Sequence, residues 1–142
     1  MVRVILNYIF LGLLLQTFLV SAKLPDWVPA EVIDMAQGEK GRCMSEHGTT
    51  QDMINAVNEG SIPNDPKITC YMFCLFESFS IIDEDGVLEY GMLTEMFPDD
   101  LKSKAETVLS GCAEQDGADN CEKVYKIATC VQSKSPDMWL MI

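Results

Sequence analysis

Apolar and polar residues along this chain recur with the spacing of α-helices, and no stretch shows the strict alternation of a β-strand. The most apolar internal stretch runs from Ile68 to Phe79 and is apolar on nearly all sides, which indicates a buried helix. Asp65 suits the N-cap of this helix, and Pro66 suits its first position. We therefore predict a central, buried helix over residues 65–79.

Five further segments carry apolar residues at helical spacing. Gly48, Gly60 and the pair Asp116-Gly117 separate them, since glycine commonly follows the last turn of a helix. Residues 83–86, Asp-Glu-Asp-Gly, predict a tight turn. The sequence thus predicts an all-α, single compact domain of about six helices. The first of the other five covers residues 29–43 and ends by Gly48. The remaining four cover residues 49–60, 87–97, 98–115 and 120–133.

Residues 1–22 are set apart from this helical domain. Arg3 is their only charge, residues 5–20 are largely apolar, and Val20-Ser21-Ala22 provides the small residues of a cleavage site. These features predict a secretory signal peptide. A transmembrane anchor is the alternative, disfavoured because the apolar core is short. The mature domain, residues 23–142, is then expected to be secreted and extracellular, with no stable membrane insertion.

The charge of the chain is strongly acidic. Its formal net charge is −12, from 10 basic and 22 acidic residues. Such a charge disfavours binding to nucleic acid or to an anionic membrane, because both repel a polyanion. The ordinary interpretation, a well-solvated surface, is the one we prefer.

The six cysteines follow the pattern C-x26-C-x3-C-x37-C-x8-C-x8-C. In a secreted chain they predict three disulfides. Six cysteines can form three pairs in about fifteen different ways. Cys70 and Cys74 share one helical face and should bond to different partners, as should Cys121 and Cys130, which lie on opposite faces. A zinc site would need tighter cysteine pairs, which the sequence lacks.

This cysteine spacing on an acidic, helical chain resembles that of the insect odorant-binding proteins, of the pheromone- and general-odorant-binding kind. Residues 70–76, Cys-Tyr-Met-Phe-Cys-Leu-Phe, and residues 81–86 also resemble family segments, as does the length of the tail after Cys130. The resemblance implies helices around an apolar cavity, closed by an apolar C-terminal tail over residues 135–142. It also implies the disulfide pairs Cys43–Cys74, Cys70–Cys121 and Cys112–Cys130.

Function is inferred from this resemblance together with the abundance of methionine. Methionine adapts to ligands of different shape, although eight methionines after residue 22 could also simply fill a core. Three disulfides favour a cavity, because they let a small bundle tolerate a hollow. The small side chains of Ala128 and Val131 suggest room and few hydrogen-bond donors. The predicted ligand-binding residues are Phe76, Tyr90, Leu93, Leu101, Ala105, Val108, Ala128, Val131, Trp139, Leu140 and Met141.

Other site chemistries are poorly supported. The turn at residues 83–86 imitates an EF-hand loop, but Ile81 and Met92 occupy the loop positions that should be acidic. The only histidine, His47, has no predicted catalytic partner, and no phosphate loop or nucleophile elbow occurs. We therefore predict no enzyme activity, no cofactor and no metal.

The predicted function is a secreted carrier of small hydrophobic volatile ligands, acting as a monomer or homodimer and delivering them to an odorant receptor. Release is expected to be pH-sensitive through the Ile142 carboxylate, with Tyr71 as hydrogen-bond donor and Lys40 or His47 adding positive charge. The alternative is a secreted structural or signalling protein with a filled core, whose apolar tail docks a partner.

Overall fold

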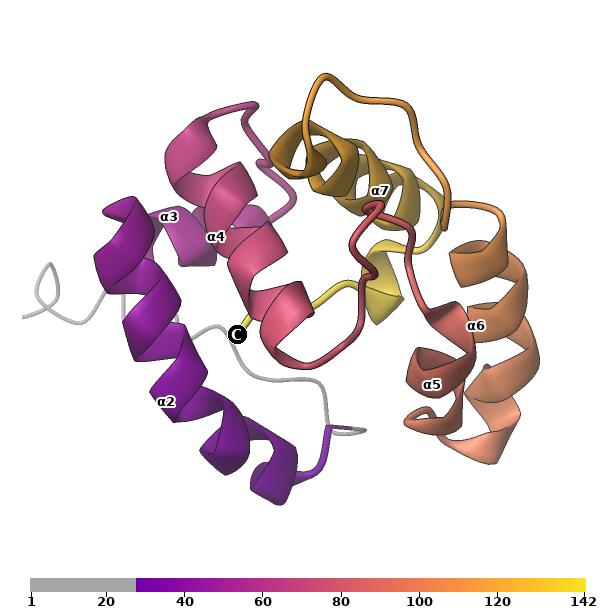
Figure 1. Ribbon diagram of the computed structural model, residues 1–142. Coiled ribbons are helices and arrows are strands. Elements are labelled where there is room, and N and C mark those ends of the chain that lie inside the picture. Colours follow the sequence, from indigo (N-terminus) through magenta and orange to yellow (C-terminus); the bar gives the residue numbers. More distant parts are fainter. Residues whose placement is uncertain (1–27) are drawn as a thin grey trace, which may run out of the picture.

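A computed structural model describes residues 28–142, so the predicted signal peptide, residues 1–22, lies outside the described part. The described residues form six α-helices and one 3-10 helix, which confirms the all-α prediction (Figure 1). The helices are α2 (Ala30–His47), α3 (Gln51–Asn58), α4 (Pro66–Ser78), α5 (Tyr90–Glu95), α6 (Asp99–Ser110), α7 (Asn120–Lys134) and η1 (Pro136–Met138).

The helix α4 is the centre of the fold. It packs against α2 on one side and α7 on the other, while α5 and α6 form a second pair beyond α7 (Figure 1). Asp65 caps it as predicted, accepting a hydrogen bond from the Lys67 backbone N–H at 2.9 Å. Ile68, Tyr71 and Met72 are fully buried. Because the helix is apolar on nearly all sides, other helices and the tail enclose it.

The helix predicted over residues 49–60 runs from Gln51 to Asn58, so it begins two residues after Thr49. Gly48 ends α2 with a φ of 66°, a left-handed conformation that glycine adopts without strain. Thr50, not Thr49, is the N-cap of α3 and accepts a hydrogen bond from the Met53 N–H at 3.3 Å. Thr49 is buried, and its hydroxyl donates to the backbone carbonyl of Lys67. The threonine that resembles a cap therefore connects two helices instead.

The predicted helix over residues 87–97 is wrong in its first turn, because α5 begins only at Tyr90. The Leu88 N–H donates to the carbonyl of Ala113 at 2.9 Å, and the Glu89 N–H donates to that of Ile81 at 2.8 Å. Residues 87–89 are thus outside the helix, and Leu88 forms an isolated β-bridge with Ile82. These contacts hold residues 87–89 against Ile81 and Ala113, and Glu89 has a non-helical ψ of 64°, so the helical path begins only at Tyr90.

The helix α6 ends at Ser110, about one turn before the predicted end near residue 115. The Lys134 ammonium donates to the carbonyl of Gly111 at 3.1 Å. Cys112 just beyond it is fully buried and bonded to Cys130 of α7. Beyond Ser110 the chain is therefore held against α7 by a hydrogen bond and a disulfide.

Three disulfides join the helices, and they confirm the predicted pairing. The two cysteines of α4 bond to different neighbours, one in α2 and one at the start of α7, so the central helix is linked covalently on both sides. The third bridge joins the end of α6 to α7. The pairs are Cys43–Cys74, Cys70–Cys121 and Cys112–Cys130, with Cα atoms 5.8, 4.6 and 5.8 Å apart.

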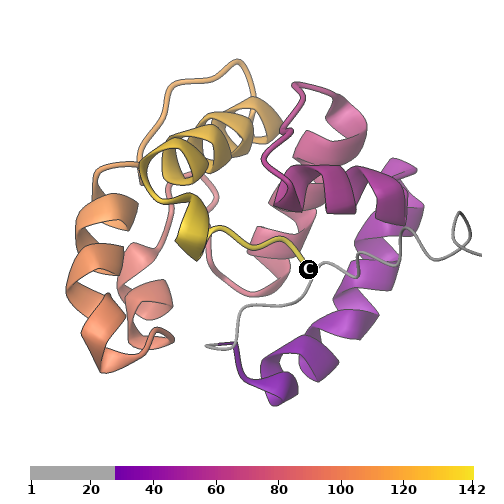
Figure 2. The same cartoon turned by 180° about the vertical axis from the view of Figure 1, so that it is seen from behind.

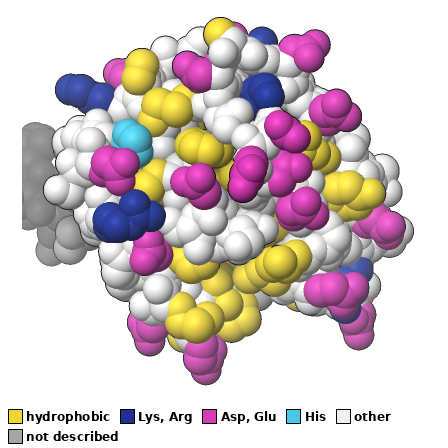
Figure 3. Space-filling view, viewed as in Figure 1, with side chains coloured by type: hydrophobic (Ala, Val, Ile, Leu, Met, Phe, Trp, Pro, Cys, Tyr) yellow, Lys and Arg dark blue, Asp and Glu magenta, His cyan; other side chains and the backbone are white. Residues whose placement is uncertain are grey.

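After α7 the chain reverses and runs back through the molecule. The segment 139–142 crosses from η1 toward α4, and its end lies beside that helix in both views (Figures 1 and 2). Acidic side chains are spread over the face seen in Figure 3, with apolar side chains between them. Within residues 28–142, no helix is both long and apolar enough to cross a membrane.

Candidate functional site

A pocket of about 170 Å³ lies between α4, α5, α7 and the C-terminal segment. Every residue that lines it has an apolar or aromatic side chain, and five consecutive residues of the tail contribute. The lining consists of Val28, Val32, Ile33, Leu75, Phe76, Phe79, Ile81, Leu88, Leu93, Met96, Phe97, Leu109, Ile127, Val131, Met138, Trp139, Leu140, Met141 and Ile142.

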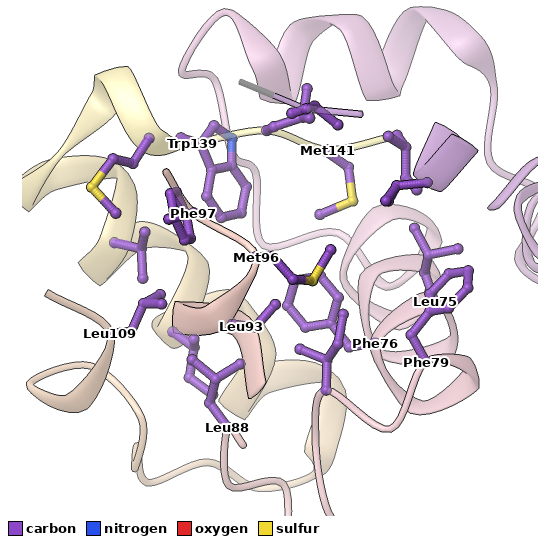
Figure 4. A pocket seen from close by; sticks show the side chains of 18 of the residues that line it. Leu75, Phe76, Phe79, Leu88, Leu93, Met96, Phe97, Leu109, Trp139 and Met141 are labelled. Carbon is purple, nitrogen blue, oxygen red and sulfur yellow. The ribbon is translucent and has the colours of Figure 1, made fainter. Parts of the chain in front are cut away.

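Opposite walls of the pocket come from segments far apart in sequence. In Figure 4, Leu75, Phe76 and Phe79 reach it from α4, whereas Leu88 and Leu93 reach it from the segment around α5. Side chains three and four positions apart lie on one helical face, so α4 presents one of its faces to the pocket. Trp139 and Met141 project into the same space from the tail.

The structure brings together part of the predicted ligand-binding set. Phe76, Leu93, Val131, Trp139, Leu140 and Met141 all line the pocket. Five predicted residues lie outside its lining. Ala105, Val108 and Ala128 belong to the buried core cluster and Leu101 packs against that cluster, while the side chain of Tyr90 is 38% exposed.

Sequence reasoning missed the contribution of α2. Val32 and Ile33 of α2 line the pocket, as does Val28 just before this helix. Met96 and Phe97, which follow α5, also line it. The apolar spacing of Val32 and Ile33 indicates a buried helical face but gives no information on which cavity that face meets. No local signal distinguishes a core contact from a pocket contact.

Asn58, at the end of α3, holds the tail by two hydrogen bonds. Its amide N–H donates to the Met141 carbonyl at 2.7 Å, and its amide oxygen accepts from the Met141 N–H at 2.6 Å. Nearby, the indole N–H of Trp139 donates to the carbonyl of Val57 at 3.1 Å. The same carbonyl accepts the Gly60 N–H at 3.0 Å, so both of its lone pairs are used. Asn58 is therefore a tail-holding residue that sequence reasoning missed.

Tyr71 and Ile142 meet as the proposed pH switch requires. The Tyr71 hydroxyl donates to the backbone oxygen of Ile142. Burial raises the pKa of Tyr71 well above its ordinary value, so the phenol remains a neutral donor at physiological pH. Among the described residues, neither Lys40 nor His47 forms a hydrogen bond or ion pair with Ile142; His47 Nε2 lies 4.0 Å from Glu46 Oε1.

One ion pair fixes the start of the tail. The Lys104 ammonium lies 2.6 Å from Asp137 Oδ2, and the Ser135 hydroxyl donates to Asp137 Oδ1 at 2.7 Å. The hydrogen bond from Lys104 and then that from Ser135 lower the pKa of Asp137 below its ordinary 3.8. A depressed carboxyl pKa stabilises the fold above 3.8, and this contribution is lost as the pH falls below that value. Asp137 therefore remains ionised at pH 5–6.

One group of side chains has ligand types that suit a metal, namely Glu46, His47 and Cys74. The sulfur of Cys74 is bonded to Cys43, so it offers no thiolate. A metal site in proteins requires deprotonated ligands. This group therefore lacks the donor set for a stable metal site.

We expect the substitution Asn58→Asp to release the tail. It keeps the shape of the side chain but removes the N–H donor and places a charge beside the Met141 carbonyl. Carboxypeptidase should then remove the tail residues faster, and the affinity of a hydrophobic probe should fall about tenfold, since bonds to buried groups contribute about 1–2 kcal/mol. Asn55→Asp is the matched control, because it adds the same charge to α3 but Asn55 bonds only within the helix, to Gln51. Equal digestion of both variants would refute this role.

The six-helix architecture, its three disulfides and an apolar pocket define the class of small helical carriers of apolar ligands. The PBP/GOBP family model matches residues 26–134, and the chain belongs to this family. It is a family of odorant-binding carriers rather than of enzymes.

Individual relatives agree with this assignment. General odorant-binding protein 69a of Drosophila melanogaster is 27% identical over 122 residues, which cover 85% of this chain and 82% of that protein. The crystal structure of the medfly odorant-binding protein CcapOBP22/CcapOBP69a superposes with a TM-score of 0.64 at 28% identity, over 73% of this chain and 90% of that one. Odorant binding protein 4 of Chrysopa pallens gives a TM-score of 0.68 at 25% identity, over 80% and 97%.

Proposed function

We propose that this protein is a secreted carrier that binds small hydrophobic molecules in the pocket between α4, α5, α7 and the tail and delivers them to a receptor. The observation that carries the proposal is a pocket lined solely by apolar and aromatic side chains, five of them from a tail held by specific hydrogen bonds. Secretion is supported by the sequence of residues 1–22 and by the three disulfides. No covalent step is involved.

Apolar burial supplies the binding energy. Each Å² of apolar surface removed from water contributes about 25 cal/mol. A ligand of about 15 non-hydrogen atoms that binds with micromolar affinity gains about −8 kcal/mol, or roughly −0.5 kcal/mol per atom. This value lies within the range that well-buried small ligands reach. Micromolar dissociation constants are therefore the expected range.

The test is a titration with the fluorescent probe N-phenyl-1-naphthylamine, followed by its displacement with volatile apolar compounds. A carrier should bind the probe with a blue-shifted emission and release it as the competitor is added. A protein with a filled core and a docking tail, the competing function, would give no saturable signal. Absence of saturation at probe concentrations up to about 100 μM would refute the carrier proposal.

We further propose that acidification loosens the tail and lowers ligand affinity. The proposal needs a free carboxylate on Ile142, the last residue of this sequence, as the acceptor of the Tyr71 hydroxyl. An ionised carboxylate is the stronger acceptor, so protonation in acid weakens this contact. The bonds from Asn58 and Trp139 involve neutral groups that do not titrate, and they should retain part of the closure at low pH.

The pH response is tested by probe titration between pH 7.5 and pH 4.5. Affinity in the unaltered protein should fall several-fold on acidification. Tyr71→Phe should bind more weakly at pH 7.5 and show a smaller pH response, because the bond to Ile142 is already absent. Phe73→Tyr on the same helix is the control, because it changes the number of tyrosines but keeps the Tyr71 hydroxyl that bonds to Ile142. A full pH response in Tyr71→Phe would place the switch elsewhere, with His47 as the next candidate.

A further inference from the structure

We infer that the pocket selects neutral, hydrocarbon-like ligands and rejects the carboxylate of the same chain length, because it offers no partner for an ionised headgroup. The inference rests on the proposed carrier function. It narrows the ligand class to neutral hydrocarbons and to esters that carry hydrocarbon chains.

The lining contains no hydroxyl, amide or charged side chain. Polar side-chain groups that contact the tail already bond to backbone atoms. The Trp139 N–H donates to the carbonyl of Val57, both polar atoms of the Asn58 amide bond to Met141, and the Tyr71 hydroxyl donates to Ile142. A carboxylate headgroup would therefore find the Trp139 and Tyr71 donors already engaged.

No buried donor is left waiting for a ligand. Among residues 28–142, every buried side-chain nitrogen or oxygen has a hydrogen-bond partner within the protein. Within these residues, no buried side-chain donor therefore lacks the partner that a ligand headgroup would supply. A carboxylate in this pocket would lose its hydration and gain no hydrogen bond in return.

The cations of the described chain also lie outside the pocket lining. Lys104 and Lys102 are engaged by Asp137 and Glu95, at 2.6 and 2.9 Å. Lys40 is the cation that most needs testing, because it lies two turns after Ile33 on the same face of α2, about 10 Å further along the helix axis. It is not a lining residue.

The lining favours polarizable neutral ligands instead. Phe76, Phe97 and Trp139 present aromatic rings to the pocket, and Met96 and Met141 project sulfur-containing side chains beside them (Figure 4). Aromatic faces and thioethers gain dispersion energy from unsaturated hydrocarbons without needing a hydrogen bond. Neutral alkenes, aromatic hydrocarbons and esters therefore fit the wall chemistry.

The experiment compares methyl dodecanoate with dodecanoate as displacers of N-phenyl-1-naphthylamine from the purified protein at pH 7.5. We expect the ester to bind at least 30-fold more tightly than the carboxylate. A ratio below tenfold would overturn the inference. If the probe itself does not bind, the carrier proposal fails, and that outcome is distinct from binding of both ligands with similar affinity.

Substitutions at Met96 test the physical cause. Met96 lines the pocket and is 42% exposed, so a charged side chain of similar length can reach both solvent and ligand. Both Met96→Lys and Met96→Gln remove the thioether from the lining, so the two variants are compared with each other: Met96→Lys should bind dodecanoate at least fivefold more tightly than Met96→Gln, and the two should bind the ester within twofold of each other. Equal carboxylate affinity in the two variants would overturn the explanation from missing positive charge.

Lys40→Gln completes the set. Because Lys40 lies outside the lining, this variant should keep the ester-to-carboxylate ratio of the unaltered protein. A selective loss of dodecanoate binding in Lys40→Gln would identify Lys40 as a headgroup partner and overturn the inference.

Discussion

Deletion of residues 138–142 is expected to weaken the binding of a hydrophobic fluorescent probe by at least 100-fold at neutral pH. All five residues line the pocket, and Met138 and Met141 are 5% and 2% exposed. Their removal opens one wall to water, so a bound ligand would lose apolar contact over that whole side. A 100-fold loss corresponds to about 2.7 kcal/mol, which is the order expected when one or two apolar side chains no longer exclude water from the ligand.

The helical core should survive this deletion, because all three disulfides lie within residues 43–130. Circular dichroism of the truncated protein should therefore retain its helical signal. A shorter deletion of residues 141–142 removes the partners of Asn58 and Tyr71 but keeps Trp139, and it should cause an intermediate loss of affinity. Probe affinity within threefold of the full chain after the longer deletion would show that the tail is not part of the binding site.

Two substitutions on α7, Ala128→Phe and Val131→Trp, should have opposite consequences. Ala128 is fully buried in the core cluster and outside the pocket lining. A phenylalanine there overpacks the core, which typically costs about 1–3 kcal/mol, so we expect a clear drop in the midpoint of thermal unfolding. Val131 lines the pocket, so a tryptophan there can occupy empty space.

Val131→Trp should therefore keep most of the stability and lose about tenfold or more in affinity for bulky ligands, with small ligands less affected. The measurements are thermal unfolding by circular dichroism and probe displacement with a small and a bulky competitor. Val131→Ala is the control, since it enlarges the pocket and should spare bulky ligands. Unchanged affinity for every ligand in Val131→Trp would mean that this wall does not face the ligand.

The contrast between these two residues shows the limit of sequence reasoning about the pocket. Both are small apolar residues three positions apart on one helix, and the sequence predicts the same role for each. Both belong to the buried core cluster, but only Val131 also lines the pocket. Such a difference depends on neighbours from other helices, which local periodicity does not encode.

Sequence alone determined the features that depend on local chemistry. The cap at Asp65 and the central helix after it follow from residues within one turn of each other. The separate partners of Cys70 and Cys74 follow from helical geometry. The two residues lie four positions apart on one face, and a disulfide between them would compete with the helical backbone, so each bonds to another segment. The full pairing followed from the family resemblance of the cysteine spacing.

Tertiary structure alone decided which distant groups satisfy one another. Residues 87–89 bond to Ile81 and Ala113 before α5 begins at Tyr90, and beyond Ser110 the chain is held to α7 by the bond from Lys134 to Gly111 and by the Cys112–Cys130 disulfide. The hold of Asn58 on Met141 spans 83 residues of sequence. Hydrogen bonds of this kind join atoms that become neighbours only after the helices pack, so no pattern along the chain can predict them.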